Sequence, residues 1–175
     1  RDSVYLYDPR DPVPTNGGGL CCNQSFVPGG AFDQREVEAR PDVLVYSTEP
    51  WDVDLEVSGP VSMTLYAATT VRDTDFTAKL VDVGPCGCAR NLTDSIVRAR
   101  YRKSTENADP IQPGQIYEYT IDLVATSNVF LQGHRVRLEI SSSNFPRFDR
   151  NPNTGEEPWR ETAPVAALQL SLIHI

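Results

Sequence analysis

The residue types that most often carry chemistry are sparse in this sequence, and they do not form a recognisable catalytic group. The two histidines are His134, at the start of an expected strand, and His174, next to the last residue. A nucleophilic hydrolase needs a serine or cysteine, a base and a group that orients the base, and no Gly-x-Ser-x-Gly elbow is present. No pair of carboxylates is marked out for acid–base work either. We therefore predict that this chain contains no catalytic residue and needs no cofactor.

The four cysteines form two close pairs, Cys21 with Cys22 and Cys86 with Cys88. Neither close pair closes a useful loop, and a structural zinc site usually has wider Cys-x-x-Cys knuckles. The pattern favours free or buried thiols, and a cross-link between the two pairs is the main alternative. Since disulfides are rare in reducing compartments, unpaired cysteines weakly favour the cytoplasm, and the sequence otherwise leaves the localisation open.

Two other motifs resemble ligand sites but lack the required context. Gly17-Gly18-Gly19 could cradle a phosphate only between a strand and a helix, followed by a lysine and a serine or threonine, and those features are missing. The three glycines instead predict a tight bend where the backbone passes close to another surface. Asp73 and Asp75 could bind calcium, but Asx turns that stabilise their own loop are the favoured interpretation. We predict no metal site.

The segment Ser141–Gly155, here called the 141–155 loop, has the densest mixture of special residues. Its asparagines and aspartate can cap turns with their side chains, and its prolines stiffen the path of the chain. Phe145 is a large apolar group in a polar loop, and Arg147 and Arg150 supply planar cationic groups. The composition predicts an ordered loop. It either closes the core of its own domain or forms a surface shared with another domain.

The elements that would position this loop are strands. Apolar residues alternate with polar ones in several short segments, which is the period-two pattern of strands that bury one face. No window has a convincing amphipathic helix. The expected strands are Val4–Tyr7, Val43–Ser47, Leu55–Val57, Val61–Tyr66, Phe76–Val81, Val97–Arg102, Tyr117–Leu123 and Arg135–Ile140. This pattern predicts an all-β fold, specifically a β-sandwich.

Arg98, Arg100 and Arg102 alternate with apolar residues in one of these segments. A basic binding stripe would give the same spacing. We favour the interpretation that the three arginines form the solvent-facing side of a strand and pair with acidic neighbours.

The composition limits the classes of partner. With 175 residues the chain fits one domain, and 39% hydrophobic residues suffice for a β domain in which half of each strand faces water. A formal net charge of −8 argues against nucleic acid and anionic membranes as partners. No apolar run approaches the roughly 20 residues that cross a bilayer. The sequence starts at Arg1 without a signal peptide or an initiating methionine, which suggests a fragment of a longer protein.

Several stretches that follow one another along the chain carry a family resemblance. They are YDPRDPVPTNGGG at Tyr7–Gly19, DQREVEARPDVLVYSTEP at Asp33–Pro50, DLEVSGPV at Asp54–Val61, DTDFTAKLVDV at Asp73–Val83, NLTDSIVRARYR at Asn91–Arg102 and TSNVFLQGHRVRLEISSSNFPRFDRNPNTG at Thr126–Gly155. In these stretches the chain resembles the C-terminal domain of the cocaine esterase and X-Pro dipeptidyl-peptidase family of serine hydrolases, also called the CocE/NonD hydrolases. So many matches in order are far more specific than any single motif.

The resemblance implies that the chain is one part of a larger enzyme. Members of the family join a catalytic α/β-hydrolase domain, a helical cap and a C-terminal β-sandwich of jelly-roll, galactose-binding-like type. The nucleophile, base and acid belong to the α/β-hydrolase domain, and family activities include hydrolysis of esters, amides and X-Pro peptide bonds. Residues 1–169 are then expected to be the non-catalytic C-terminal domain, which packs on the catalytic domain and helps to wall the acyl pocket. The chain alone is expected to be inactive.

By resemblance, the turn at Gly17–Leu20 and the loop at Asn144–Asn151 are candidates for the face shared with the other domains or with the substrate pocket. The candidate residues are Gly18, Gly19, Leu20, Asn144, Phe145, Arg147, Asp149 and Arg150. The expected partners are the α/β-hydrolase and cap domains of the same full-length chain, together with a small ester, amide or peptide substrate.

Two segments depart from the family pattern. Cys86-Gly87-Cys88 stands where relatives usually have a polar Asp-Gly turn, so neither cysteine is expected to be functional. The tail at Leu170–Ile175 does not match the apolar β segment with which relatives end. We therefore expect that residues 170–175 are not native to the family and that the last strand of the sandwich is missing or replaced. A missing strand would leave an unpaired sheet edge.

Two other functions remain open from the residues alone. Jelly rolls also serve as independent carbohydrate-binding modules, although a fold by itself does not establish a function. Trp51 and Trp159 are the only tryptophans that could stack on sugars. A domain that mediates contacts in a homo-oligomer is the third interpretation, and it is compatible with the first.

Overall fold

Two antiparallel sheets make up the computed structural model of the chain, which describes residues 2–20, 25, 27–156, 160 and 163–172. The elements in chain order are β1 (Asp2–Tyr7), α1 (Arg35–Glu38), β2 (Leu44–Ser47), β3 (Leu55–Thr69), β4 (Asp75–Val83), β5 (Ala89–Arg98), the 3-10 turn η1 (Ala99–Tyr101), β6 (Tyr117–Phe130), β7 (Arg135–Ser141) and β8 (Ala167–Leu172). Almost all of this regular structure is strand, which confirms the predicted all-β class. No helix among the described residues is long and apolar enough to span a membrane.

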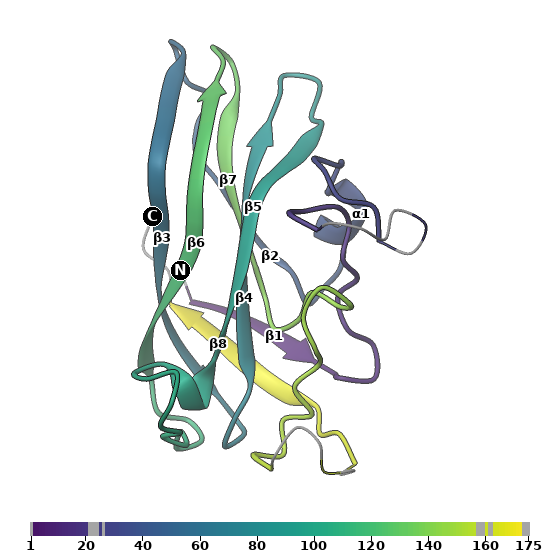
Figure 1. Cartoon of the computed structure of the whole chain (residues 1–175), viewed down its shortest axis with the longest axis vertical. Helices are drawn as coiled ribbons and strands as arrows, with labels where there is room; N and C mark the ends of the chain where they lie inside the picture. Colours follow the sequence, from purple (N-terminus) through teal and green to yellow (C-terminus); the bar gives the residue numbers. More distant parts are fainter. Residues whose placement is uncertain (1, 21–24, 26, 157–159, 161–162, 173–175) are drawn as a thin grey trace.

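The two sheets have four strands each and face one another (Figure 1). One sheet has the order β1-β8-β3-β6 and is called here the β1 sheet; the other has the order β2-β7-β4-β5 and is called the β2 sheet. The chain changes sheet at every connection except the β4–β5 hairpin. This strand order is that of an eight-stranded jelly roll.

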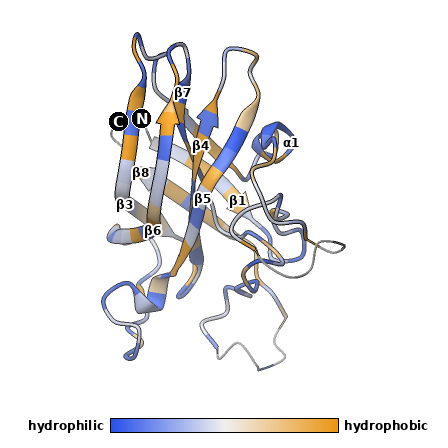
Figure 2. Cartoon of the chain, turned by 45° about the horizontal axis from the view of Figure 1, so that its top comes forward, coloured by the Kyte–Doolittle hydropathy of each residue, from blue (hydrophilic) through white to orange (hydrophobic). Residues whose placement is uncertain are grey.

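The core lies between the sheets and follows the predicted alternation. Leu65, Tyr119 and Ile121 of the β1 sheet and Phe76 and Ile140 of the β2 sheet are all nearly or fully buried. The rings of Phe76 and Tyr119 are 4.8 Å apart between centroids, so the two sheets are in direct contact. Figure 2 shows hydrophilic and hydrophobic residues alternating along β3. The strand buries one side against this core and leaves the other outside.

The segment around Gly59-Pro60 does not separate two strands, as the sequence had suggested. β3 continues through it from Leu55 to Thr69, and its pairing with β6 shifts register between Pro60 and Ser62. Gly59 has a φ of 125°, which other residues rarely adopt, so the two residues form a bulge within one long strand.

The predicted solvent-facing arginines are in fact mostly buried. The side chains of Arg98, Arg100 and Arg102 are only 19%, 7% and 3% exposed. The strand ends at Arg98 and the chain turns into η1, which sends the following arginines inwards. Pairing with acidic residues is present, but on the inside. The ion pairs are Arg98–Asp75 at 2.9 Å, Arg100–Asp73 at 2.7 Å and Arg102–Asp109 at 2.6 Å.

The same ion pairs account for Asp73 and Asp75. Their carboxylates receive hydrogen bonds from Arg98, Arg100 and Asn151, all more than 20 residues away along the chain. These long-range partners replace the local Asx turns that the sequence favoured. Both carboxylates are neutralised by guanidinium groups, and the described residues contain no cluster of acidic, histidine or cysteine side chains suited to a metal ion.

The end of the chain completes the sandwich. Residues 170–172, assigned from the sequence to an atypical tail, belong to β8, which lies between β1 and β3 and pairs with both. The predicted gap at this position is therefore wrong: the eighth strand is present, and no sheet edge is opened there. Residues 173–175 lie outside the described part of the chain. That residues 170–175 are foreign to the family stays a prediction.

The prediction of free thiols is wrong for one cysteine pair. Cys86 and Cys88 form a disulfide at the tip of the β4–β5 hairpin. Sequence reasoning dismissed this bond because the loop that it closes is so short. Cys21 and Cys22 lie outside the described residues.

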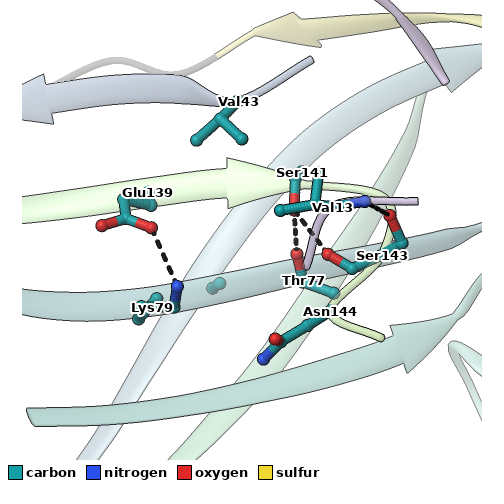
Figure 3. A pocket seen from close by; sticks show the side chains of 9 residues that line it. Val13, Val43, Thr77, Lys79, Glu139, Ser141, Ser143 and Asn144 are labelled. Carbon is teal, nitrogen blue, oxygen red and sulfur yellow. Dashed lines mark hydrogen bonds and ion pairs between the residues drawn. The ribbon is translucent and has the colours of Figure 1, made fainter. Parts of the chain in front are cut away.

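The outer face of the β2 sheet is covered by the chain itself over the central strand β4. Val13, Gln34 and Val43 pack there, and only Asp82 of β4 is not buried, whereas Val45 of the edge strand β2 is 38% exposed. Lys79 forms an ion pair of 3.1 Å with Glu139 of β7 and donates a hydrogen bond of 2.8 Å to Gln34 Oε1. Figure 3 shows this pair under Val43. The cover is therefore attached by a hydrogen bond from a buried ammonium group as well as by apolar contacts.

The outer face of the β1 sheet has no such cover within the described residues. Val4, Leu6 and Leu168 are 59%, 55% and 49% exposed, and the register of β1 and β8 places Leu6 opposite Leu168. Towards β6 the same face is polar, with exposed residues such as Thr120 and Asp122. The apolar part, here called the apolar half-face, consists of Val4, Leu6, Tyr66, Leu168, Leu170 and Leu172.

Candidate functional site

The 141–155 loop is fixed at the point where it leaves β7. Ser141 Oγ lies 2.6 Å from Thr77 Oγ1, and Ser143 Oγ accepts a hydrogen bond of 2.9 Å from the backbone N–H of Val13. Figure 3 shows these side chains converging on one small cavity of about 10 Å³, which is room for roughly one water molecule. The first residues of the loop therefore belong to the interior of the domain.

The next part of the loop is bound to the N-terminal segment. Phe145 N–H donates to Val13 O at 2.9 Å, and Thr15 N–H donates to Phe145 O at 2.7 Å, as in a short parallel bridge. The backbone N–H of Arg147 donates to Thr15 Oγ1 at 3.1 Å. Two segments that are about 130 residues apart thus form one rigid unit.

The glycine turn lies against this unit at a buried ion pair. Arg147 Nε is 2.9 Å from Asp94 Oδ2, and Asn144 Nδ2 donates to the same oxygen at 2.7 Å. A Cβ atom on Gly18 would lie 3.1 Å from Asp94 Oδ1 and 3.3 Å from Arg147 Nη1, and one on Gly19 would lie 3.6 Å from Arg147 Nη2. The predicted close approach of backbone to another surface is therefore real, and the surface is the Asp94–Arg147 pair.

Burial dominates the electrostatics of this cluster. Desolvation raises the pKa of the Asp94 carboxyl above its usual value, and the neighbouring Arg147, Lys79 and Asn144 oppose that rise. Asp94 Oδ1 and Asn144 Oδ1 are buried without a hydrogen-bond partner among the described residues. The cluster orients the arginine firmly, but it offers no nucleophile.

The outer part of the loop is exposed. Phe145 is 39% exposed, the Arg150 guanidinium lies 5.3 Å from its ring centroid, and Arg150 Nη1 donates to Pro9 O at 3.2 Å. Asp149, whose side chain is 73% exposed, lies 3.4 Å from Arg98. An aromatic ring with an adjacent cation and a carboxylate is an arrangement suited to contact with another protein surface.

The far end of the loop is held by Asn151. Its Nδ2 donates to Asp73 Oδ2 at 3.0 Å and to Asp75 Oδ1 at 2.8 Å, and its carbonyl accepts a bond of 3.1 Å from the Tyr7 hydroxyl. Asn151 is 1% exposed. The loop is thus clamped at both ends, and only its middle faces outwards.

Seven of the eight predicted site residues fall into two groups. Gly18, Gly19, Asn144 and Arg147 come together around Asp94. Phe145 and Arg150 contact each other in the exposed middle of the loop, where Asp149 also lies. Leu20 is half-buried, and its N–H donates to Gly18 O at 2.9 Å. Their role as a shared face stays a prediction.

Sequence reasoning missed the two residues that hold the site. Asp94 lies in β5, where an acidic residue in a strand looks like a solvent-facing one. Asn151 looked like a turn former, and its buried position depends on Asp73 and Asp75, which are distant in sequence. The available signal was weak: both lie in stretches that carry the family resemblance.

The described residues contain no catalytic triad. His134 Nδ1 is 2.8 Å from Asp82 Oδ1, but no described serine or threonine hydroxyl is hydrogen-bonded to this imidazole. Trp51 is half-buried and packs against the main core, so it is not a free sugar platform. Trp159 lies outside the described residues. Fold and site together define an accessory β-sandwich domain with a clamped loop and an uncovered apolar half-face.

Comparison with known proteins identifies the family. Residues 2–172 match the X-Pro dipeptidyl-peptidase C-terminal non-catalytic domain. The chain therefore belongs to this family, as its sequence motifs indicated.

Three relatives illustrate the match. The chain is 51% identical over 171 residues to the cocaine esterase of Rhodococcus sp. (strain MB1 Bresler), which covers 98% of this chain and 29% of the esterase. Among solved structures, an α-amino acid ester hydrolase is similar with a TM-score of 0.88 and 30% identity, over 98% of this chain and 30% of that one. An aminopeptidase from a marine sediment Thaumarchaeota archaeon gives a TM-score of 0.86 and 32% identity, over 98% and 31%. The chain spans less than a third of each relative.

Proposed function

We propose that this chain is the accessory domain of a serine hydrolase that acts on ester, amide or X-Pro peptide bonds. The domain packs on the catalytic part of the same protein and supplies part of the wall of its acyl pocket. The observation that carries this proposal is the apolar half-face, which is open in a domain whose relatives are more than three times as long.

The apolar half-face is a physical reason for packing. Monomeric proteins rarely leave several neighbouring aliphatic side chains about half exposed, and such patches mark contact surfaces. Burying the exposed remainder of Val4, Leu6 and Leu168 would contribute about 1 kcal/mol for each residue. A catalytic part joined to the domain through the chain has a high effective concentration at this surface, which favours it over a separate partner.

A groove of about 280 Å³ lies beside the half-face and begins at Leu6. Its acidic side chains already have cationic partners: Arg10 pairs with Asp8 at 2.8 Å, and Arg40 pairs with Asp11 at 3.3 Å and with Asp42 at 2.8 Å. Apolar contact with the half-face, rather than charge, is therefore the reason for packing.

The middle of the 141–155 loop is the part of the domain best suited to the pocket wall. Phe145 offers exposed ring surface, and the clamps at Asn144 and Asn151 hold it in place. A wall of this kind limits the size of the acyl group and excludes water, and it transfers no proton.

A chimera tests the proposal. The matched 171 residues of the Rhodococcus cocaine esterase are replaced by this chain, and single cysteines are introduced as Leu168→Cys, Phe145→Cys and Ser127→Cys. Ser127 is an exposed residue of β6 outside the half-face and the loop, so it is the matched control. The rate of maleimide labelling at each site is read by peptide mass spectrometry, in the chimera and in the chain alone.

We expect Leu168→Cys and Phe145→Cys to react about tenfold more slowly in the chimera than in the chain alone, with Ser127→Cys unchanged. Protection of Phe145→Cys alone would remove the half-face from the interface, and protection of neither would overturn the proposal. The chimera should hydrolyse p-nitrophenyl esters, and the chain alone should not. Turnover by the chain alone that is lost on mutating one of its own residues would contradict the non-catalytic assignment.

A further inference from the structure

A short disulfide lies at the exposed tip of the β4–β5 hairpin. Cys86 and Cys88 are separated by one residue; Cys86 is exposed and Cys88 is half-buried. The hairpin is closed without this bond: Gly84 N–H donates to Cys88 O at 3.1 Å, and Gly87 N–H donates to Gly84 O at 2.9 Å. Gly87 has a φ of 79°, which suits the turn.

This disulfide is expected to contribute little to the stability of the fold. A cross-link stabilises a fold mainly by restricting the unfolded chain, and the effect shrinks with the length of the closed loop. Here the loop contains a single intervening residue, and backbone hydrogen bonds already define the tip. An exposed disulfide that the fold does not need can open and close by exchange with external thiols.

A histidine–aspartate pair lies beside the tip. His134 Nδ1 is 2.8 Å from Asp82 Oδ1, so the opposite edge of the imidazole ring is available. That edge faces Gly84: a Cβ atom there would lie 3.6 Å from His134 Nε2 and 3.6 Å from Cys86 Sγ. Since Gly84 has no side chain, the ring and the sulfur both border the space over its Cα atom. An imidazole next to a cysteine can take its proton and favour the reactive thiolate.

We propose that Cys86 and Cys88 form a thiol–disulfide exchange site for small monothiols and their disulfides, with Cys86 as the reacting sulfur and His134 as its proton acceptor. The proposal does not depend on the hydrolase function. Asp82 is a positioning residue, which holds the imidazole with Nε2 towards the tip.

The exchange balances in both directions. In the reduced state, the Cys86 thiol gives its proton to His134 Nε2, and the thiolate attacks one sulfur of a small disulfide RSSR. An S–S bond forms between Cys86 and RS, and RS⁻ leaves. The Cys88 thiol gives its proton to the released RS⁻, and the resulting thiolate attacks Cys86 Sγ, forms the Cys86–Cys88 bond and releases a second RS⁻. The cysteine pair loses two electrons and RSSR gains them; the reverse reaction consumes RSH and RS⁻ and passes through the same mixed disulfide on Cys86.

The first test traps that mixed disulfide. Cys21 and Cys22 are replaced by serine so that they do not react with the probe. The reduced chain is incubated with oxidised glutathione as the probe, with either Cys88→Ser or Cys86→Ser added. We expect glutathione on Cys86 in the first variant to form about tenfold faster than glutathione on Cys88 in the second. Equal rates, or no adduct on Cys86, would overturn the proposal.

The second test asks whether the imidazole acts on the thiol. In the Cys88→Ser background, His134→Gln keeps a hydrogen-bonding group beside Asp82 and removes the base. Asp82 contacts the ring, Arg90 lies opposite Asp82 in the β4–β5 register, and Arg135, the next residue along the chain, pairs with Glu49 at 3.4 Å. We expect His134→Gln to slow the reaction with oxidised glutathione about tenfold at pH 7 and to have no effect at pH 10, where the thiol is ionised anyway. A loss that persists at pH 10 would indicate a structural role and would contradict the proposal.

The third test separates exchange from structural support. The variant with both Cys86→Ser and Cys88→Ser should keep the circular dichroism spectrum and the unfolding midpoint of the chain. A large loss of stability would show that the disulfide is a structural cross-link and would overturn the proposal.

Discussion

The outer faces of the two sheets differ in how they are shielded from water. In the β2 sheet, the outer face of β4 is covered by residues that precede β2, and the contact includes the hydrogen bond from Lys79, the partner of Glu139, to Gln34 and the ion pair between Arg137 and Glu38 at 2.7 Å. The β1 sheet has an apolar half-face that no described residue covers. A cover supplied by the same domain can be fixed by matched charges, because both partners fold together. The apolar half-face, which we propose receives another part of the protein, instead offers aliphatic side chains, which tolerate imperfect matching.

The largest expected effect on stability comes from unbalancing the charges beneath the cover of the β2 sheet. Lys79→Met at pH 8 removes the cation that lowers the pKa of the buried Glu139 carboxyl, so this carboxyl must take up a proton or stay charged without a partner, and we expect a loss of about 4 kcal/mol in the free energy of unfolding. Urea denaturation measures this loss. Because Lys79→Met combined with Glu139→Leu removes both charges, the double variant should recover most of the stability. If the single variant is as stable as the parent, the ion pair beneath the cover does not contribute to stability.

The pH dependence of the covered face is the next largest effect. Burial raises the pKa of the Glu139 carboxyl from 4.5 to about 7, against the opposing influence of Lys79, and Glu38 raises it further. The folded state therefore binds the proton more tightly than the unfolded state. This contribution to stability is fully present below pH 4.5 and is lost as the pH rises through about 7.

We expect Glu139 to account for a fall of about 2 kcal/mol in the free energy of unfolding between these two pH values. The control is Glu139→Gln, which keeps the shape and cannot titrate in this range. Urea denaturation of both proteins at several pH values isolates the contribution of Glu139 to the free energy of unfolding, because the other carboxyls are common to both. Identical slopes would show that Glu139 is not protonated preferentially in the folded state.

The sequence predicts the strands far better than what lies on top of them. The alternation in Phe76–Val81 correctly placed Phe76 and Leu80 in the core, but it also suggested that Lys79 faces water. Nothing local to β4 reveals that a segment some 40 residues earlier packs on its other side. The burial of Arg100 was missed for a different reason, since the alternation did not reveal that the strand ends at Arg98 and continues into η1.

The site shows a similar division. The turn at Gly17–Leu20 and the 141–155 loop could be singled out from their composition and the family motifs. Their contact could not, because it runs through Asp94, a strand residue whose partners come from both ends of the chain. The disulfide of Cys86 and Cys88 was missed because sequence spacing alone gave no reason for so short a loop.

The contact between the glycine turn and the Asp94–Arg147 pair gives a smaller effect. Gly18 has a φ of 103°, and an added Cβ atom would lie 3.1 Å from Asp94 Oδ1. We expect Gly18→Ala to cost about 2 kcal/mol. Gly114→Ala is the matched control, since Gly114 has a φ of 81° with no atom within 4 Å of the added Cβ, and it should cost about 1 kcal/mol. Thermal unfolding compares the two; equal losses would mean that the turn is not packed tightly on the ion pair.

The smallest effects come from making one substitution on both outer faces. Val81 on β4 is fully buried beneath the cover, whereas Val4 on β1 is 59% exposed. Valine and threonine have nearly the same shape, and Val→Thr replaces one methyl group by a hydroxyl. The loss of stability therefore reports whether that hydroxyl is removed from water. Val81→Thr should cost about 1 kcal/mol because its hydroxyl is buried, and Val4→Thr should change the stability of the chain by less than about 0.5 kcal/mol.

In the chimera with the catalytic part of the cocaine esterase, Val4→Thr should become as costly as Val81→Thr, because the apolar half-face is then covered. Chemical denaturation of the chain and of the chimera provides the comparison. A Val4→Thr variant that stays neutral in both would mean that the half-face remains in water, and the difference between the two outer faces would then give no support to the proposed docking.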